Sequence, residues 1–69
     1  MYRFLAVIEH TDTNFSAYIP DLPGCVATGK TREEVEHNLR EAVGMHIRGL
    51  LEDHLPVPVP NADAEYIAV

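Results

Sequence analysis

Hydrophobic and polar positions first indicate a β-strand over residues 2–9. This segment is rich in aromatic and β-branched residues, which favour strands. Its middle is apolar at successive positions, so both faces of the strand carry apolar side chains, a pattern typical of a strand covered on two sides. One face would carry Tyr2, Phe4, Ala6 and Ile8, and the other Arg3, Leu5, Val7 and Glu9.

Two more strands are predicted to follow. Residues 10–14 supply turn chemistry, because Asp and Asn side chains bond to nearby backbone, and residues 15–19 then alternate as a second strand of a hairpin. Residues 20–24 interrupt the pairing, because their two prolines have no backbone N–H to donate. Residues 25–28 are predicted as a short third strand, ended by Gly29.

A helix is predicted from about residue 32 to about residue 53. Thr31 and Glu34 have the spacing of a capping box, with Thr31 as N-cap and Glu34 reaching back to its amide. Apolar residues then recur at steps of three and four, which places them on one stripe of an amphipathic helix. The stripe consists of Val35, Leu39, Ala42, Val43, Ile47, Leu50 and Leu51.

The C-terminal segment is predicted to be extended. Residues 55–60 alternate with proline, which favours polyproline II geometry and a stiff connector; the alternative is a proline-rich ligand for an aromatic groove. Residues 65–69 are predicted as a last strand. Residues 1–69 thus form one α+β domain of order β-β-β-α-β, a small antiparallel sheet with one helix packed on one face.

The pattern also predicts self-association. A single helix covers only one face of the sheet, whereas Leu5 and Val7 require cover on the other. A second subunit would supply it, so we expect a homodimer or a tetramer. Cys25 is the only cysteine, which excludes an intramolecular disulfide as an alternative source of stability.

Charge and hydropathy narrow the classes of partner. Eleven acidic against five basic residues give a net charge of −6, which disfavours nucleic acid and favours a basic protein. The apolar run at residues 4–8 is too short for a membrane span and lacks the features of a secretory signal, so a cytoplasmic protein is expected.

Candidate chemistry in the sequence is sparse. Glu33 and His37 form the best local metal-binding pair, but two ligands make a weak site. Glu9 and Asp21 are the residues of an alternative, a residual metal-dependent nuclease, although such centres need several converging carboxylates. Cys25 is expected in the core. We predict no catalytic residue, no metal site and no cofactor.

The segment Tyr18–Gly29, Tyr-Ile-Pro-Asp-Leu-Pro-Gly-Cys-Val-Ala-Thr-Gly, resembles the signature of HicB-type antitoxins. The helix start at residues 31–35, the pair at residues 41–42 and the proline-rich stretch at residues 55–60 are also similar to that family. The resemblance implies a partial ribonuclease-H-like fold without a working nuclease site. It also implies binding to a small basic HicA toxin, an mRNA-cleaving ribonuclease, whose active surface the antitoxin occludes.

Longer family members carry a C-terminal DNA-binding domain, whereas this sequence ends at Val69, so no direct binding of nucleic acid is expected. The partner-binding residues are predicted on one sheet edge and the adjacent loop, where exposed aromatic and loop residues often anchor interfaces. They are Tyr18, Pro20, Asp21, Leu22 and Pro23. Two alternatives remain: the segment is only a rigid turn, or the chain is an orphan oligomeric binding module without a toxin.

Overall fold

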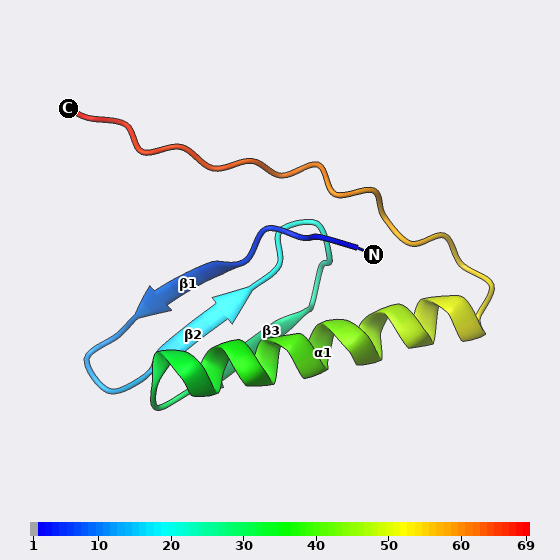
Figure 1. The fold of residues 1–69 in the computed structure, drawn as a ribbon, viewed down its shortest axis with the longest axis horizontal. Coiled ribbons are helices and arrows are strands. Elements are labelled where there is room, and N and C mark those ends of the chain that lie inside the picture. The colour runs from blue at the N-terminus through cyan, green and yellow to red at the C-terminus, as the bar shows by residue number, and fades with distance from the viewer. Residues whose placement is uncertain (1) are drawn as a thin grey trace.

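Three antiparallel strands and one long helix form the folded part of the chain in the computed structural model, which describes residues 2–69 (Figure 1). The strands are β1 (Val7–His10), β2 (Phe15–Tyr18) and β3 (Val26–Gly29), in the spatial order β1-β2-β3. The helix is α1 (Arg32–Glu52). The predicted α+β fold, with an antiparallel sheet and one helix, is confirmed.

The register of the strands separates a covered face of the sheet from an uncovered one. Residues directly opposite each other in an antiparallel ladder point to the same face. The face under the helix carries Ile8, Ala17 and Ala27, and the uncovered face carries Val7, Tyr18 and Val26. Single-sided cover by α1 leaves the second face without a layer of its own in the described residues.

The buried core is small and lies under the first half of the helix. It consists of Ala17, Ile19, Leu22, Cys25, Val35 and Leu39. The second half of α1 extends past the end of the sheet (Figure 1). Cys25 therefore packs in the core, as the sequence predicts, and burial raises the pKa of its thiol.

The start of α1 is fixed by its cap and by a close backbone contact. The Thr31 hydroxyl accepts the Glu34 N–H at 3.0 Å, as predicted. The Glu34 carboxylate instead accepts the N–H of Lys30, at 3.1 Å, one residue before the predicted amide. A Cβ on Gly29 would lie 2.6 Å from the Val35 nitrogen, so only glycine lets β3 approach the helix this closely.

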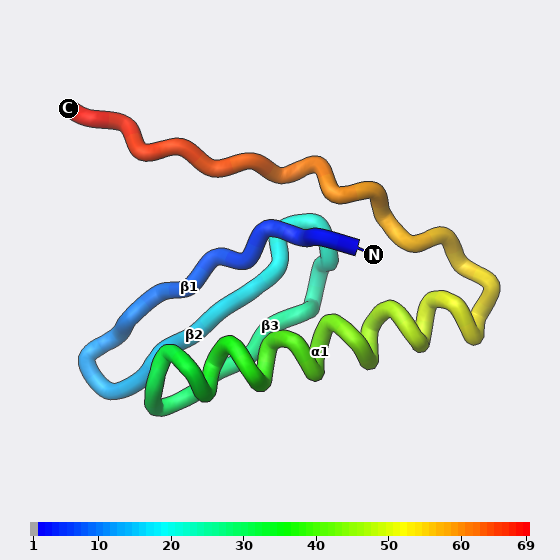
Figure 2. Tube along the Cα trace, in the orientation of Figure 1, coloured from blue at the N-terminus to red at the C-terminus, as the bar shows by residue number. Residues whose placement is uncertain are grey.

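The helix ends in a tight reversal. The Leu55 N–H donates to the Leu50 carbonyl at 2.8 Å, and the His54 N–H donates to the Leu51 carbonyl at 3.1 Å. This is a Schellman motif, with His54 at the left-handed position (φ 56°) that glycine usually occupies. The chain then runs back along the sheet as an extended segment (Figure 2).

Two predicted strands are corrected, one in its bounds and one in its existence. The predicted strand over residues 2–9 begins only at Val7, because Val7 pairs with Tyr18 and earlier residues would face the turn that contains Pro20 and Pro23. The predicted last strand at residues 65–69 is wrong, because this extended segment joins no strand. The fifth element of the predicted β-β-β-α-β order is therefore missing, and the ribonuclease-H-like comparison stays a prediction.

Within residues 2–69, no helix combines the length and the apolarity that crossing a membrane requires.

Candidate partner-binding surface

The segment from Tyr18 to Pro23 joins β2 to β3 through a tightly bonded connection. The Ile19 N–H donates to the Cys25 carbonyl at 3.1 Å, and the Cys25 N–H donates to the Leu22 carbonyl at 3.0 Å. Gly24 adopts a positive φ of 83°, which a side chain would strain. These bonds fix the backbone of the connection, which we call the platform, and its side chains have different surroundings.

Leu22 lies inside this platform and not on its surface. Its exposed fraction is 0%, and it packs in the same cluster as Val35 and Leu39. Its burial fixes the connection against the helix. A partner protein cannot contact the Leu22 side chain. Leu22 can affect binding only by holding the neighbouring residues in position.

Asp21 holds the C-terminal segment. Its carboxylate oxygens accept the backbone N–H of Asn61 at 3.0 Å and that of Ala62 at 3.0 and 3.2 Å. A carboxylate that accepts two backbone N–H groups makes charge-assisted bonds, the stronger kind of hydrogen bond. Asp21 thus acts as a clamp between the β2–β3 connection and a segment 40 positions later in the sequence.

Tyr18, Pro20 and Pro23 remain exposed and available to a partner. Tyr18 is 41% exposed and lies on the uncovered face between Val7 and Val26, its neighbours in the ladder. We name Val7, Tyr18 and Val26 the Tyr18 row. A phenol flanked by two aliphatic side chains is the composition found at interface anchors, where an apolar ring carries a polar tip.

Val26 is the member of this surface that the sequence analysis missed. It is 64% exposed, high for a valine within a strand, and it lines a shallow hollow of about 400 Å³ together with Tyr18. The polar residues Ser16 and Thr28 lie opposite each other beside it and also line the hollow. Alternation in the third strand was the available signal, since Val26 and Thr28 share a face by period two.

The arrangement argues against a nuclease centre at Glu9 and Asp21. Glu9 pairs with Ser16, and Asp21 follows Ser16 by five residues along the chain. β2 spans Phe15–Tyr18, so Glu9 lies beside the start of this strand and Asp21 beyond its end, with the rise of β2, about 3.3 Å per residue, between them. Metal ions shared by two carboxylates require far shorter separations. In the described part of the chain, no three metal-ligating side chains converge.

Two of the four histidines contact neighbouring side chains. His37 pairs with Glu41 at 3.0 Å, so the predicted local pair of His37 with Glu33 is not the one formed. His10 stacks on Phe15, its neighbour across the hairpin, with ring centroids 4.1 Å apart.

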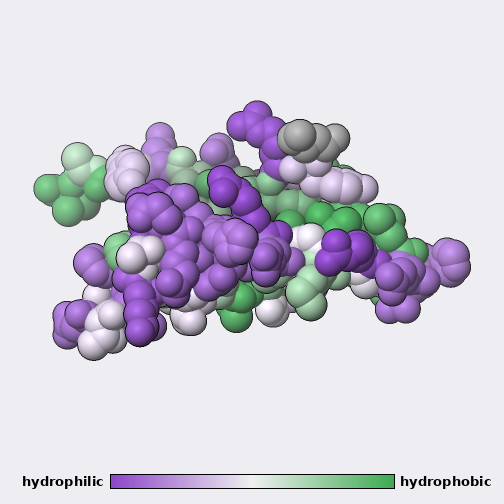
Figure 3. Space-filling view, turned by 60° about the horizontal axis from the view of Figure 1, so that its bottom comes forward, coloured by the Kyte–Doolittle hydropathy of each residue, from purple (hydrophilic) through white to green (hydrophobic). Residues whose placement is uncertain are grey.

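The outer surface of the helix is strongly hydrophilic (Figure 3). The molecule therefore presents an acidic polar exterior with an apolar row on its open sheet face.

Comparison with known proteins identifies similar chains. The family model of HicB-like antitoxins of bacterial toxin–antitoxin systems matches residues 4–68. A 14.9 kDa protein of Haemophilus phage HP1 is 38% identical over 60 residues, covering 87% of this chain and 45% of that protein. Antitoxin HicB 2 of Photorhabdus laumondii is 29% identical over 63 residues, covering 91% of this chain and 45% of that protein.

A solved structure is also similar. A chain from the HicA3 and HicB3 toxin–antitoxin complex superimposes with a TM-score of 0.66 at 36% identity, covering 81% of this chain and 65% of that chain. The chain thus spans about half the length of the phage relative and of HicB 2, and about two thirds of the solved structure.

Proposed function

Since the chain belongs to the HicB-like antitoxin family, we propose that it binds and neutralises a small basic ribonuclease toxin of the HicA type. The observation that carries this proposal is the match over residues 4–68, together with the likeness to a chain of a toxin–antitoxin complex. The net charge of −6 supports it, because opposite charge speeds encounter with a basic protein.

The proposed mechanism is occlusion without catalysis. The antitoxin contacts the toxin through the Tyr18 row and the exposed Pro20 and Pro23, while Asp21 and Leu22 hold these residues in place. The surface is pre-formed, since the β2–β3 connection is fixed by backbone hydrogen bonds and by a buried leucine. A pre-formed surface loses little conformational freedom on binding. The site of action would be the cytoplasm, where mRNA is cleaved.

We further propose that the protein acts as a homo-oligomer. The extended C-terminal segment, which lies apart from the Tyr18 row, leaves large apolar side chains exposed, among them Tyr66 at 104% and Ile67 at 73%. Contiguous apolar surface on a small domain is a common sign of an interaction site.

A growth assay tests the toxin pairing. A small basic reading frame adjacent to the gene, where the genome carries one, is expressed alone and together with this chain. We expect growth arrest from the toxin alone and recovery on co-expression. Arrest that persists while this chain is present as folded protein would overturn the proposal, and would favour an orphan binding module.

Substitution of Tyr18 maps the surface. Tyr18→Ala should weaken toxin binding by about five- to thirtyfold, since a central aromatic anchor contributes on the order of 1–2 kcal/mol. The matched control is Tyr2→Ala, a tyrosine of similar exposure (51%) that lines a groove beside α1. Equal binding by both variants and the parent would remove the Tyr18 row from the toxin interface.

A further inference from the structure

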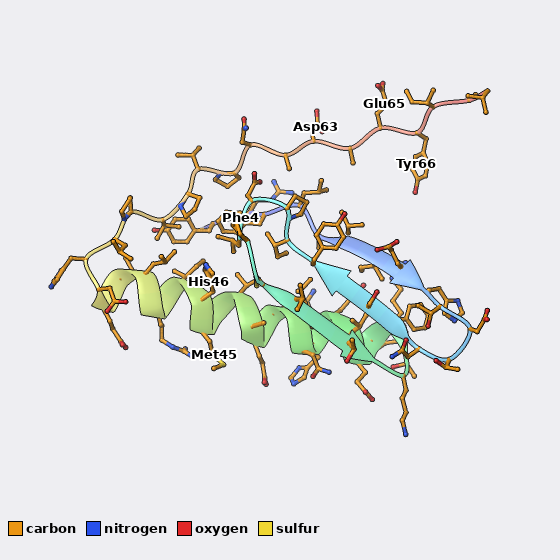
Figure 4. The ribbon with its side chains drawn as sticks, turned by 180° about the vertical axis from the view of Figure 1, so that it is seen from behind. Phe4, Met45, His46, Asp63, Glu65 and Tyr66 are labelled. Carbon is orange, nitrogen blue, oxygen red and sulfur yellow. The ribbon has the colours of Figure 1, made fainter. Side chains whose placement is uncertain are left out.

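The C-terminal arm, residues 64–69, has the form of a β-strand without a partner. Side chains alternate from the residue before the arm onward: Asp63 and Glu65 point away from the body of the molecule, whereas Tyr66 points back toward the sheet (Figure 4). After Ala64, no backbone N–H of the described chain donates a hydrogen bond. The arm therefore presents a complete set of backbone donors and acceptors that an edge strand could pair with.

The arm is also apolar and unpacked. Tyr66 is 104% exposed, Ile67 73% and Val69 121%, so none of these side chains is buried against its own domain. Figure 3 shows hydrophobic atoms projecting at the end of the molecule where the chain terminates. Aliphatic and aromatic side chains of this kind stabilise a structure only when another surface removes them from water.

The matching edge is β1. It pairs with β2 on one side, and no strand pairs with its other side among residues 2–69. A groove of about 370 Å³ separates this free edge from the arm, lined by residues 5–8 on one side and residues 64–66 on the other. Arg32 also lines the groove, while the arm and the residue before it carry the acidic Glu65 and Asp63.

The clamp at Asp21 sets the path on which the arm leaves the body of the molecule. It fixes Asn61 and Ala62 at the β2–β3 connection, and the following residues leave it on a path separated from β1 by the groove. The arm runs beside β1 in the same direction (Figure 1). An arm from a second copy, related by a two-fold axis normal to the sheet, would enter the groove antiparallel to both.

We infer that residues 64–69 are an exchange arm, and that in a homodimer each arm adds to the free edge of β1 of the other copy. The strand order at the junction is then β1, partner arm, own arm and partner β1, which gives one sheet through both subunits and leaves no free edge on β1 or the arm. Strand addition of this kind derives affinity from main-chain hydrogen bonds and specificity from alternate side chains.

The inference deepens the proposed self-association and is tested without a toxin, so a negative toxin assay leaves it intact. Sedimentation of the full chain at micromolar concentration should give a dimer. Ile67→Pro removes a backbone donor from the arm and should weaken the dimer by at least about tenfold. The matched control, Val59→Pro, lies between two prolines outside the arm and should leave the dimer unchanged. A monomeric parent, or a dimer that Ile67→Pro does not weaken, would overturn the inference.

Cross-linking separates exchange from closure within one chain. Proteins carrying Ala6→Cys and Tyr66→Cys, in a Cys25→Ser background, are mixed and oxidised. We expect a heterodimer between the two variants and none when Tyr66→Cys is mixed with His37→Cys, whose position is on the outer surface of α1. A chain that carries both Ala6→Cys and Tyr66→Cys and cross-links only within itself would instead show closure in cis and overturn the exchange.

Discussion

Apolar side chains are buried in one region of the molecule and exposed in another. The first region is the body, from β1 to the first half of α1, and the second is the C-terminal segment, residues 55–69. In the body, Leu22 and Val35 are fully buried. In the C-terminal segment, Val59 is 80% exposed and Tyr66 104%. Both regions are rich in apolar residues, so composition does not separate them; the available packing surface does. Apolar side chains of the body bury one another, whereas those of the C-terminal segment can be buried only against another molecule.

The largest expected effect of a substitution is in the body. Leu22→Ala should lower the free energy of unfolding by about 2–5 kcal/mol, because it empties a fully enclosed site. Val59→Ala, which removes apolar atoms from the C-terminal segment, should change it by less than about 0.5 kcal/mol. Urea unfolding followed by circular dichroism at one fixed protein concentration measures both. Equal losses would contradict the contrast between the two regions.

Two glycines test how tightly different parts of the body are packed. Gly29→Ala should destabilise the protein by about 1–3 kcal/mol, because the added Cβ would meet the backbone nitrogen of Val35 at 2.6 Å. Gly44→Ala places the same methyl group where no atom lies within 4 Å, and should stabilise α1 by up to about 1 kcal/mol. Thermal unfolding of the two variants reports the opposite signs. A neutral Gly29→Ala would show that β3 and α1 do not approach each other this closely.

The cap of α1 should have an intermediate effect. Thr31→Ala removes the hydroxyl that accepts the Glu34 N–H and should cost about 1 kcal/mol of unfolding free energy. Thr31→Ser keeps an acceptor at the same position and should remain within a few tenths of a kcal/mol of the parent. Chemical denaturation distinguishes them, and identical losses in both variants would point to lost packing of the methyl group.

The smallest effect concerns Cys25 and pH. Burial raises the pKa of its thiol above the ordinary value of 9.0, so the folded protein keeps the proton to a higher pH than the unfolded chain does. Its contribution to stability is full below pH 9.0 and is lost as the pH rises through the folded pKa. Stability in alkaline buffer should therefore fall less steeply in Cys25→Ala than in the parent. Equal slopes for the two proteins would contradict burial of the thiol.

Much of the body could be predicted from the sequence, because its signals are local. The spacing of Thr31 and Glu34 predicts the cap, and the stripe from Val35 to Leu51 predicts the helix. The predicted end of α1, at about residue 53, is also confirmed, although His54 occupies the left-handed position that glycine usually marks. The predicted strand at residues 65–69 is wrong in this chain, because a strand is defined by its neighbour and strand propensity alone supplies none.

The sequence separates the exposed from the buried members of the candidate site only in part, for the same reason. Tyr18, Pro20 and Pro23 are exposed, as an interface requires, but Leu22 belongs to the core and Asp21 binds backbone groups near residue 61. Contacts across 40 residues leave no periodic signal in a single sequence. The position of Val26 beside Tyr18 depends on strand register, which the structure supplies.

The central proposal is that this chain, whose net charge is −6, binds a small basic toxin through the pre-formed Tyr18 row and the exposed Pro20 and Pro23. Calorimetric titration of the purified chain with a HicA-type toxin from the same genome, where one is encoded, tests it most directly when carried out at two salt concentrations. We expect saturable binding that weakens at the higher salt concentration, because part of the attraction is between opposite net charges. Absence of a binding signal with both proteins folded would contradict it.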